Sequence, residues 1–188
     1  MIKNFIFLII VVIISFTLYS ALFAEVSEPV STHVGTGESF PTNGPDLNGF
    51  QFKRISGGAT VYYIIDKETN KPIVTKIVIT GCGGTYETTG NGKAGGVEMT
   101  SLWNCTITIN GSLGNLIIEY DNNTINCGGD VTVTLIKDAD DNTITDTTPG
   151  TGLGTGYTEG LVIQGGPDKY RGSDNKFTRF NSVRGHRP

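Results

Sequence analysis

The sequence predicts an all-β protein, a single antiparallel β-sandwich of about seven to eight strands with flexible N- and C-terminal segments. The composition is rich in Thr, Gly, Asn, Val and Ile and poor in Leu, Ala and Met, which favours half-buried strands over helices. From residue 50 onward, short β-branched runs alternate with turn residues. We therefore expect almost no helix after residue 24.

Eight runs carry the expected strands, and short polar segments between them predict hairpins. The runs are "FQFKRI", "ATVYYII", "IVTKIVIT", "GVEMTSL", "CTITI", "NLIIEY", "TINC" and "VTVTLIK". Residues 64–79 read as one such hairpin, with "DKETNKP" as its turn. Ile77 and Ile79 then point into the core, because side chains on one face of a strand recur every second residue.

The N-terminus predicts export. Lys3 precedes an uncharged apolar run over residues 5–24. Residues 1–24 are expected to be a signal peptide cut after Ala24, although a run of this length also fits an uncleaved signal anchor. Either way the chain is expected to be extracytoplasmic, secreted or surface-anchored, and to contact the membrane only through an uncleaved anchor.

The rest of the chain divides by composition into four parts. Residues 25–49 predict a linker and residues 50–146 the sandwich domain. Residues 147–167 form a Gly/Thr-rich segment in which "LVIQ" predicts a last short strand, and residues 168–188 predict a basic flexible tail.

Charge also divides the chain. Residues 25–167 carry seven basic and sixteen acidic side chains, a net charge of −9, whereas residues 168–188 carry six basic and two acidic ones, a net charge of +4. An acidic body argues against nucleic acid as a ligand. The basic tail is expected to dock on a neighbouring copy, to touch an anionic envelope polymer, or to serve solubility alone.

One segment resembles a known family. Asp66, Thr69, Lys71 and Pro72, followed by a strand and then "TYETTGNGKAGGV", resemble the carboxypeptidase regulatory-like domain and the related B-type repeats of collagen adhesins, over roughly residues 58–120. Those proteins are transthyretin-like β-sandwiches. The resemblance implies a non-catalytic module that acts as a spacer, stabiliser or adhesive unit at cell surfaces.

Three cysteines in an exported chain predict one disulfide and one leftover thiol. Cys105 opens "CTITI", where its side chain shares the inward face, so it is expected to be the buried thiol. Cys82 and Cys127 lie at strand ends beside glycines. We therefore expect a Cys82 to Cys127 bridge.

The stretch "DADDNTITD" resembles the start of an oxygen-ligand calcium loop. Its candidate ligands are Asp138, Asp140, Asn142 and Asp146. The loop's usual Gly and its terminal Glu are missing, which favours a hairpin tip over a calcium site. Calcium is the one cofactor for which the sequence offers candidate ligands.

Catalytic residues are not indicated. The two histidines, His33 and His186, fall in the expected linker and tail, where neither has the rigid surroundings that a general base requires. A carboxylate-based hydrolase would need two acids that converge in a cleft, which spacing alone does not predict. Candidates for a carbohydrate platform are Trp103, Tyr62, Tyr63 and Tyr86, but a lone Trp in a small sandwich is more often a core residue.

These observations together predict a non-catalytic secreted or cell-surface protein with a structural or adhesive role. The alternative is a glycan- or calcium-binding module, and a small carboxylate-based hydrolase comes third. The expected partner is a cell-surface polymer, a glycan or a protein, with self-association as a further alternative and no nucleic acid.

Overall fold

The computed structural model describes residues 27–135, 139–147, 161–165 and 176–179. This part of the chain is mostly β-strand, with one helix of four residues, as the composition predicts. The elements in chain order are β1 (Val30–His33), β2 (Ser39–Phe40), β3 (Gln51–Ser56), β4 (Ala59–Ile65), β5 (Pro72–Ile79), β6 (Gly84–Asn91), α2 (Gly92–Gly95), β7 (Glu98–Thr100), β8 (Cys105–Ile118), β9 (Thr124–Cys127), β10 (Val131–Leu135), β11 (Thr143–Asp146), β12 (Leu161–Gly165) and β13 (Lys176–Arg179).

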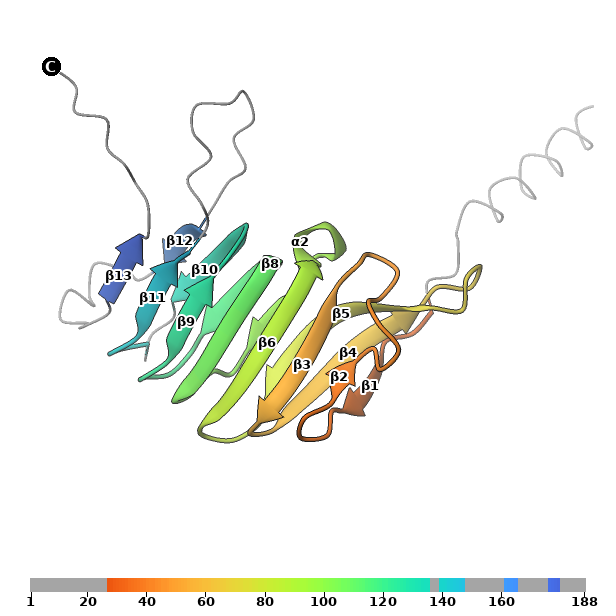
Figure 1. Ribbon diagram of the computed structural model, residues 1–188, viewed down its shortest axis with the longest axis horizontal. Coiled ribbons are helices and arrows are strands. Elements are labelled where there is room, and N and C mark those ends of the chain that lie inside the picture. Colours follow the sequence, from red (N-terminus) through yellow and green to blue (C-terminus); the bar gives the residue numbers. More distant parts are fainter. Residues whose placement is uncertain (1–26, 136–138, 148–160, 166–175, 180–188) are drawn as a thin grey trace, which may run out of the picture.

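The predicted single antiparallel sandwich is wrong, because the strands from β6 onward pair in parallel. In one layer, here called the front sheet, β6, β8, β9, β11 and β13 lie side by side and parallel (Figure 1). β3 extends this sheet antiparallel to β6, and β2 pairs antiparallel with β3. In the other layer, the back sheet, β5, β7, β8, β10 and β12 are parallel, and β4 and β1 extend it. The result is a curled, β-solenoid-like arrangement.

The chain winds from the front sheet to the back sheet and forward again. Successive coils are formed by β6 with β7, by the two halves of β8, by β9 with β10, and by β11 with β12. In β8, residues 105–112 pair with β6 and residues 113–118 pair with β10, so this one strand passes through both layers. Equivalent positions recur after roughly twenty residues, the short repeat expected of a solenoid.

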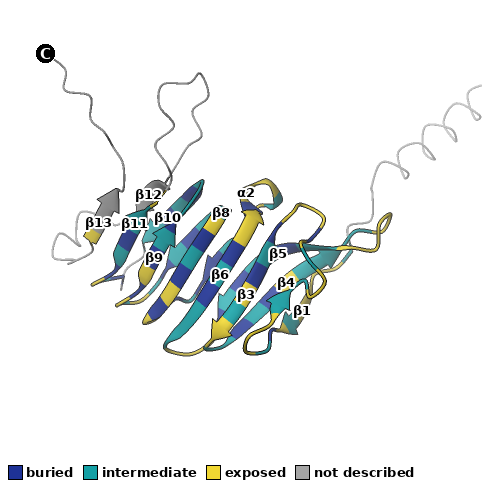
Figure 2. Ribbon diagram, viewed as in Figure 1, coloured by how far each residue is buried: buried dark blue, intermediate teal, exposed yellow. Residues whose placement is uncertain are grey.

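The core lies between the two layers and is formed by stacked side chains. Tyr86, Ile107, Ile125 and Ile144 are register partners on successive front strands, and each is fully buried. Their neighbours along each strand point outward, so buried residues alternate with residues of intermediate or full exposure on the front sheet in Figure 2. Full burial of one such aliphatic side chain contributes about 1.5–3 kcal/mol.

Glycines stack on one another where the chain leaves the front strands and turns toward the back sheet. A Cβ atom added to Gly129 would lie 1.9 Å from the carbonyl oxygen of Gly111, and one added to Gly111 would lie 2.2 Å from that of Gly90. Only glycine permits successive backbones to approach this closely. Close packing of the coils therefore requires glycine at positions 111 and 129, in the pairs "NG" and "GG".

The expected hairpin over residues 64–79 is confirmed. β4 and β5 pair antiparallel, and Ile77 and Ile79 are buried. In the turn, Asp66 accepts hydrogen bonds from the Oγ1 of Thr69 at 2.6 Å and from its backbone N–H at 2.7 Å. These bonds lower the pKa of the Asp66 carboxyl.

The expected linker over residues 25–49 is instead part of the fold where the structure describes it. β1 pairs with β4, and Asp46 is buried. Its carboxylate accepts backbone hydrogen bonds from Phe50 at 2.9 Å and from Val74 at 2.8 Å, which tie this segment to β5. Buried backbone donors need such partners, and the sequence pattern did not reveal them.

The expected flexible tail over residues 168–188 also contributes to the fold. β13 lies within this range and pairs in parallel with β11. The expected strand at "LVIQ" is present as β12, which pairs with β10. The expected signal peptide or anchor, residues 1–24, lies outside the described residues.

Candidate binding edge

Four turns lead from the back sheet into the front strands and form one edge of the molecule, here called the corner edge. It comprises residues 80–83, 101–104, 119–123 and 139–142. In each turn, a residue one or two positions before the start of the front strand has positive φ. These register-equivalent residues are Gly83 (74°), Asn104 (53°), Asn122 (59°) and Asp141 (48°). Asn and Asp are the side chains that tolerate this left-handed conformation best after glycine.

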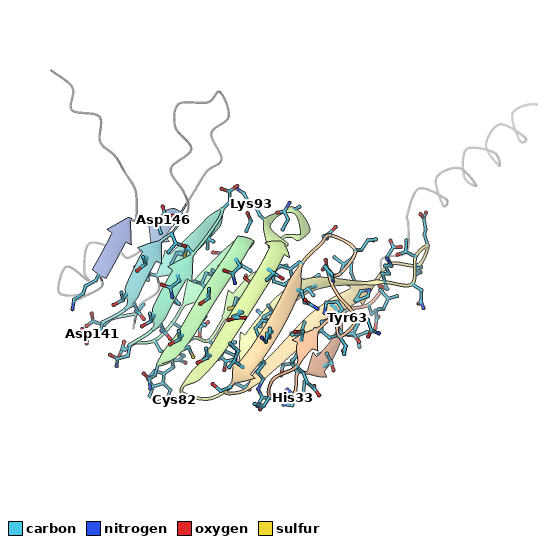
Figure 3. The ribbon with its side chains drawn as sticks, viewed as in Figure 1. His33, Tyr63, Cys82, Lys93, Asp141 and Asp146 are labelled. Atoms are coloured by element: carbon cyan, nitrogen blue, oxygen red, sulfur yellow. The ribbon has the colours of Figure 1, made fainter. Side chains whose placement is uncertain are left out.

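Backbone hydrogen bonds join each turn of the corner edge to the next. Gly83 donates to the carbonyl of Trp103 at 2.9 Å, and Asn104 donates to that of Asp121 at 2.9 Å. Asn122 donates to the carbonyl of Asp140 at 3.2 Å. In Figure 3 this edge carries the labelled residues Cys82 and Asp141, and the labels of Lys93 and Asp146 mark the opposite edge. The turns are therefore one continuous surface.

Two buried asparagines hold the corner edge from inside. Asn123 donates through Nδ2 to Oδ1 of Asn142 at 2.8 Å and to the carbonyls of Leu102 and Tyr120 at 3.0 Å each. Its own Oδ1 accepts the backbone N–H of Cys105 at 2.9 Å. One amide side chain thus fixes three successive turns.

Two aromatic rings project from the outside of the same turns. Trp103 and Tyr120 lie on successive coils, with ring centroids 6.0 Å apart and planes inclined by 40°. Trp103 is 49% exposed and Tyr120 is 43% exposed, so the expectation that Trp103 is a core residue is wrong. Its ring lies outside because the corner turns, unlike the strands, do not face the interior.

The backbone beneath this ring pair is held firmly. The carbonyl of Trp103 accepts hydrogen bonds from the N–H of Gly83 and, at 3.1 Å, from the thiol of Cys105. Exposed amide side chains, those of Asn104 and Asn122, lie on the same two turns as the rings. A rigid aromatic pair with amides nearby can stack on an apolar ligand face and hydrogen-bond to its polar rim.

The expected calcium ligands are not brought together as one set. Asn142 is buried and accepts from Asn123, and Asp140 accepts the backbone N–H of Asp141 at 2.9 Å. Asp146 is the last residue of β11 and lies at the edge opposite the corner edge (Figure 3). Asp138 lies outside the described residues. Within the described ranges, no group of three or more His, Cys, Asp or Glu side chains is placed to hold a metal ion. The motif instead encodes a corner turn and the strand after it.

All three cysteines are free thiols, so the expected bridge between Cys82 and Cys127 is not formed. Cys82 is exposed in the turn before β6, whereas Cys127 is buried in β9, two coils further along. Cys105 is buried, as its place in "CTITI" predicted. Burial raises the pKa of Cys105, and burial together with the charge of Asp146 raises that of Cys127 to about 12.

His33, the one histidine that the structure describes, lies exposed on β1. Its Nδ1 is 3.1 Å from the carbonyl oxygen of Ala59 and 3.0 Å from the hydroxyl of Thr60. These contacts hold the ring against β4, far from the corner turns of the later coils (Figure 3). His186 lies outside the described residues.

The described part of the chain contains no helix long and apolar enough to cross a membrane. The fold and edge together define a parallel β-solenoid-like protein that begins with antiparallel strands and carries an exposed aromatic pair. No family model matches the chain, and no curated protein or solved structure was found to be similar to it. The transthyretin-like sandwich that the sequence resemblance implies is not this fold.

Proposed function

We propose that this protein is an exported, non-catalytic adhesion module that binds the glycan of a cell-surface polymer through the corner edge. The single observation that supports this function is the exposed pair of Trp103 and Tyr120, 6.0 Å apart on hydrogen-bonded turns. Large aromatic side chains are usually buried, so two exposed neighbours on a rigid surface indicate a ligand.

The chemistry of the edge fits a sugar better than the other ligand classes considered. Aromatic faces pack against the apolar face of a pyranose ring, while amide groups such as those of Asn104 and Asn122 hydrogen-bond to its hydroxyls. Nucleic acid does not fit, because residues 25–167 have a net charge of −9.

The spacing of the coils also favours a chain-like glycan. Neighbouring strands lie about 4.8 Å apart, and each coil adds one corner turn at this interval. A linear polysaccharide lying along the edge would therefore meet an aromatic ring on each of two successive turns. Export by residues 1–24 would place this edge where such polymers occur.

A binding assay tests the proposal. The protein is incubated with a panel of insoluble and soluble polysaccharides, and retention is measured by pull-down and affinity electrophoresis. Trp103→Ala should weaken retention on the bound polymer about tenfold, because a stacking contact and its buried area are lost.

Tyr62 provides the matched control. It is 36% exposed on β4, in the back sheet away from the corner edge, so Tyr62→Ala should bind like the wild type. Binding to no polysaccharide in the panel, or equal weakening by the two variants, would contradict the proposed function.

A further inference from the structure

The outward face of the front sheet carries a regular array of threonines. On β6, β8, β9 and β11, the residues on either side of the buried ladder point away from the core. Most of these positions hold threonine, and they are Thr85, Thr106, Thr108, Thr124, Thr143 and Thr145. We call this surface the threonine face.

The threonines are in register from coil to coil. Thr85, Thr106, Thr124 and Thr143 are successive register partners in the parallel ladders. Within β8, Thr106 and Thr108 share the face, and within β11, Thr143 and Thr145 share it. The hydroxyls and methyls thus form rows about 4.8 Å apart across the strands and about 6.6 Å apart along them.

This array is stiff and neutral. Threonine is β-branched, so its χ1 angle is restricted and every copy presents its methyl and hydroxyl in few orientations. Strands β6, β8, β9 and β11 of the front sheet run side by side (Figure 1), and their parallel ladders bring identical side chains into register. Charges lie at the borders, where Lys53 pairs with Glu87 at 3.8 Å and where Lys176 is exposed.

A ligand that uses such a face must repeat in two dimensions with the same spacings. A mineral surface would favour carboxylates, and a polysaccharide sheet would favour aromatic rings, but the threonine face contains neither, and Glu87 lies at its border. Ice is a regular lattice of water, which hydrogen-bonds to hydroxyls and orders around methyl groups. We propose that the threonine face binds the surface of ice.

The threonine face is separate from the corner edge, so the two proposals can fail independently. The threonine face is formed by strands, whereas Trp103 and Tyr120 lie on turns at one end of those strands. Trp103→Ala should therefore leave ice binding unchanged, which distinguishes failure of one proposal from failure of the other.

The experiment measures thermal hysteresis, ice recrystallisation and adsorption of the fluorescently labelled protein to a growing ice crystal. The wild type should adsorb and inhibit recrystallisation, and Thr124→Tyr in the middle of the array should lower the activity at least tenfold. Thr132→Tyr is the control, because Thr132 points outward from β10 in the back sheet. Melting curves confirm that each variant is folded.

Thr106→Lys, at an exposed position of the same array, gives a second variant in case Thr124→Tyr does not fold. It should abolish adsorption, because a hydrated cation interrupts the neutral array. Exclusion of the wild-type protein from ice, as for an inert protein of the same size, would overturn the proposal. Equal activity of the array variants and the Thr132→Tyr control would overturn it as well.

Discussion

Asn123 lies directly opposite Asn142 on the next coil and donates a hydrogen bond to it through Nδ2 at 2.8 Å, in the interior of the protein. The backbone N–H of Asn123 donates to the same oxygen at 2.9 Å. This contact joins two coils at the corner where the chain enters the front sheet. It requires a side chain with both a donor and an acceptor, which explains why an amide is buried here.

Asn123→Ala should lower the free energy of unfolding by about 3 kcal/mol or more, because the buried N–H of Cys105 and two carbonyls lose their partner. Chemical denaturation measures the change. Asn126→Ala, three residues further along the chain on the outer face, is the matched control and should cost under about 0.5 kcal/mol. Equal losses in the two variants would show that the amide does not hold the corner.

Gly129→Ala should destabilise the protein by about 2 kcal/mol more than Gly96→Ala. The Cβ of alanine at position 129 would collide with the backbone of Gly111 at 1.9 Å, whereas a Cβ at position 96 meets nothing within 4 Å. Gly96 has a φ of 68°, so its substitution measures the conformational cost alone, about 1 kcal/mol. Thermal melting of both variants makes the comparison, and a smaller loss for Gly129→Ala would refute the close stacking of coils.

Thiol chemistry should distinguish the three cysteines. At pH 8 the native protein should react with one equivalent of a thiol reagent, at Cys82, because Cys105 and Cys127 are buried and burial raises the pKa of both. Denaturant should expose all three. Peptide mapping identifies the labelled residue, and a native protein with no reactive thiol would instead favour a disulfide at Cys82.

Stability should fall at alkaline pH. The pKa of Cys127 is raised to about 12 in the folded protein. The contribution of its protonated thiol to the free energy of unfolding is therefore fully present below the ordinary thiol pKa and is lost between about pH 9 and pH 12. The loss from this group is about 4 kcal/mol. Unfolding free energies at several pH values measure it, and Cys127→Ala should flatten this part of the profile. An unchanged slope in that variant would assign the effect to other groups.

Much of the β-structure could be predicted because alternation of apolar residues depends only on which face of a strand is buried. The runs "ATVYYII", "CTITI" and "TINC" are strands for this reason. The same alternation arises in parallel and antiparallel sheets, so it did not reveal how the strands pair. β6 was missed because its sequence, "GTYETTGN", has the composition of a turn.

The missed signal was a short internal repeat. "NCTI" at residues 104–107, "NNTI" at 122–125 and "DNTI" at 141–144 each contain a left-handed corner residue followed by the first residues of a front strand. Such recurrence indicates a solenoid. The third copy was interpreted as part of a calcium loop because a corner turn and a metal loop favour the same Asp and Asn side chains.

The ring pair could not be predicted from sequence, because Trp103 and Tyr120 meet only when one coil stacks on the next. Each residue alone is typical of a core position. The stacking of coils is therefore what creates the candidate site.

The most direct test of this account is a double-mutant cycle on glycan binding, with Trp103→Ala, Tyr120→Ala and the double variant measured against the same polysaccharide. If the two rings form one site, the losses should be non-additive by about 0.5 kcal/mol or more. Losses that add to within about 0.3 kcal/mol would show that the rings act separately, and they would contradict a binding site built from two stacked coils.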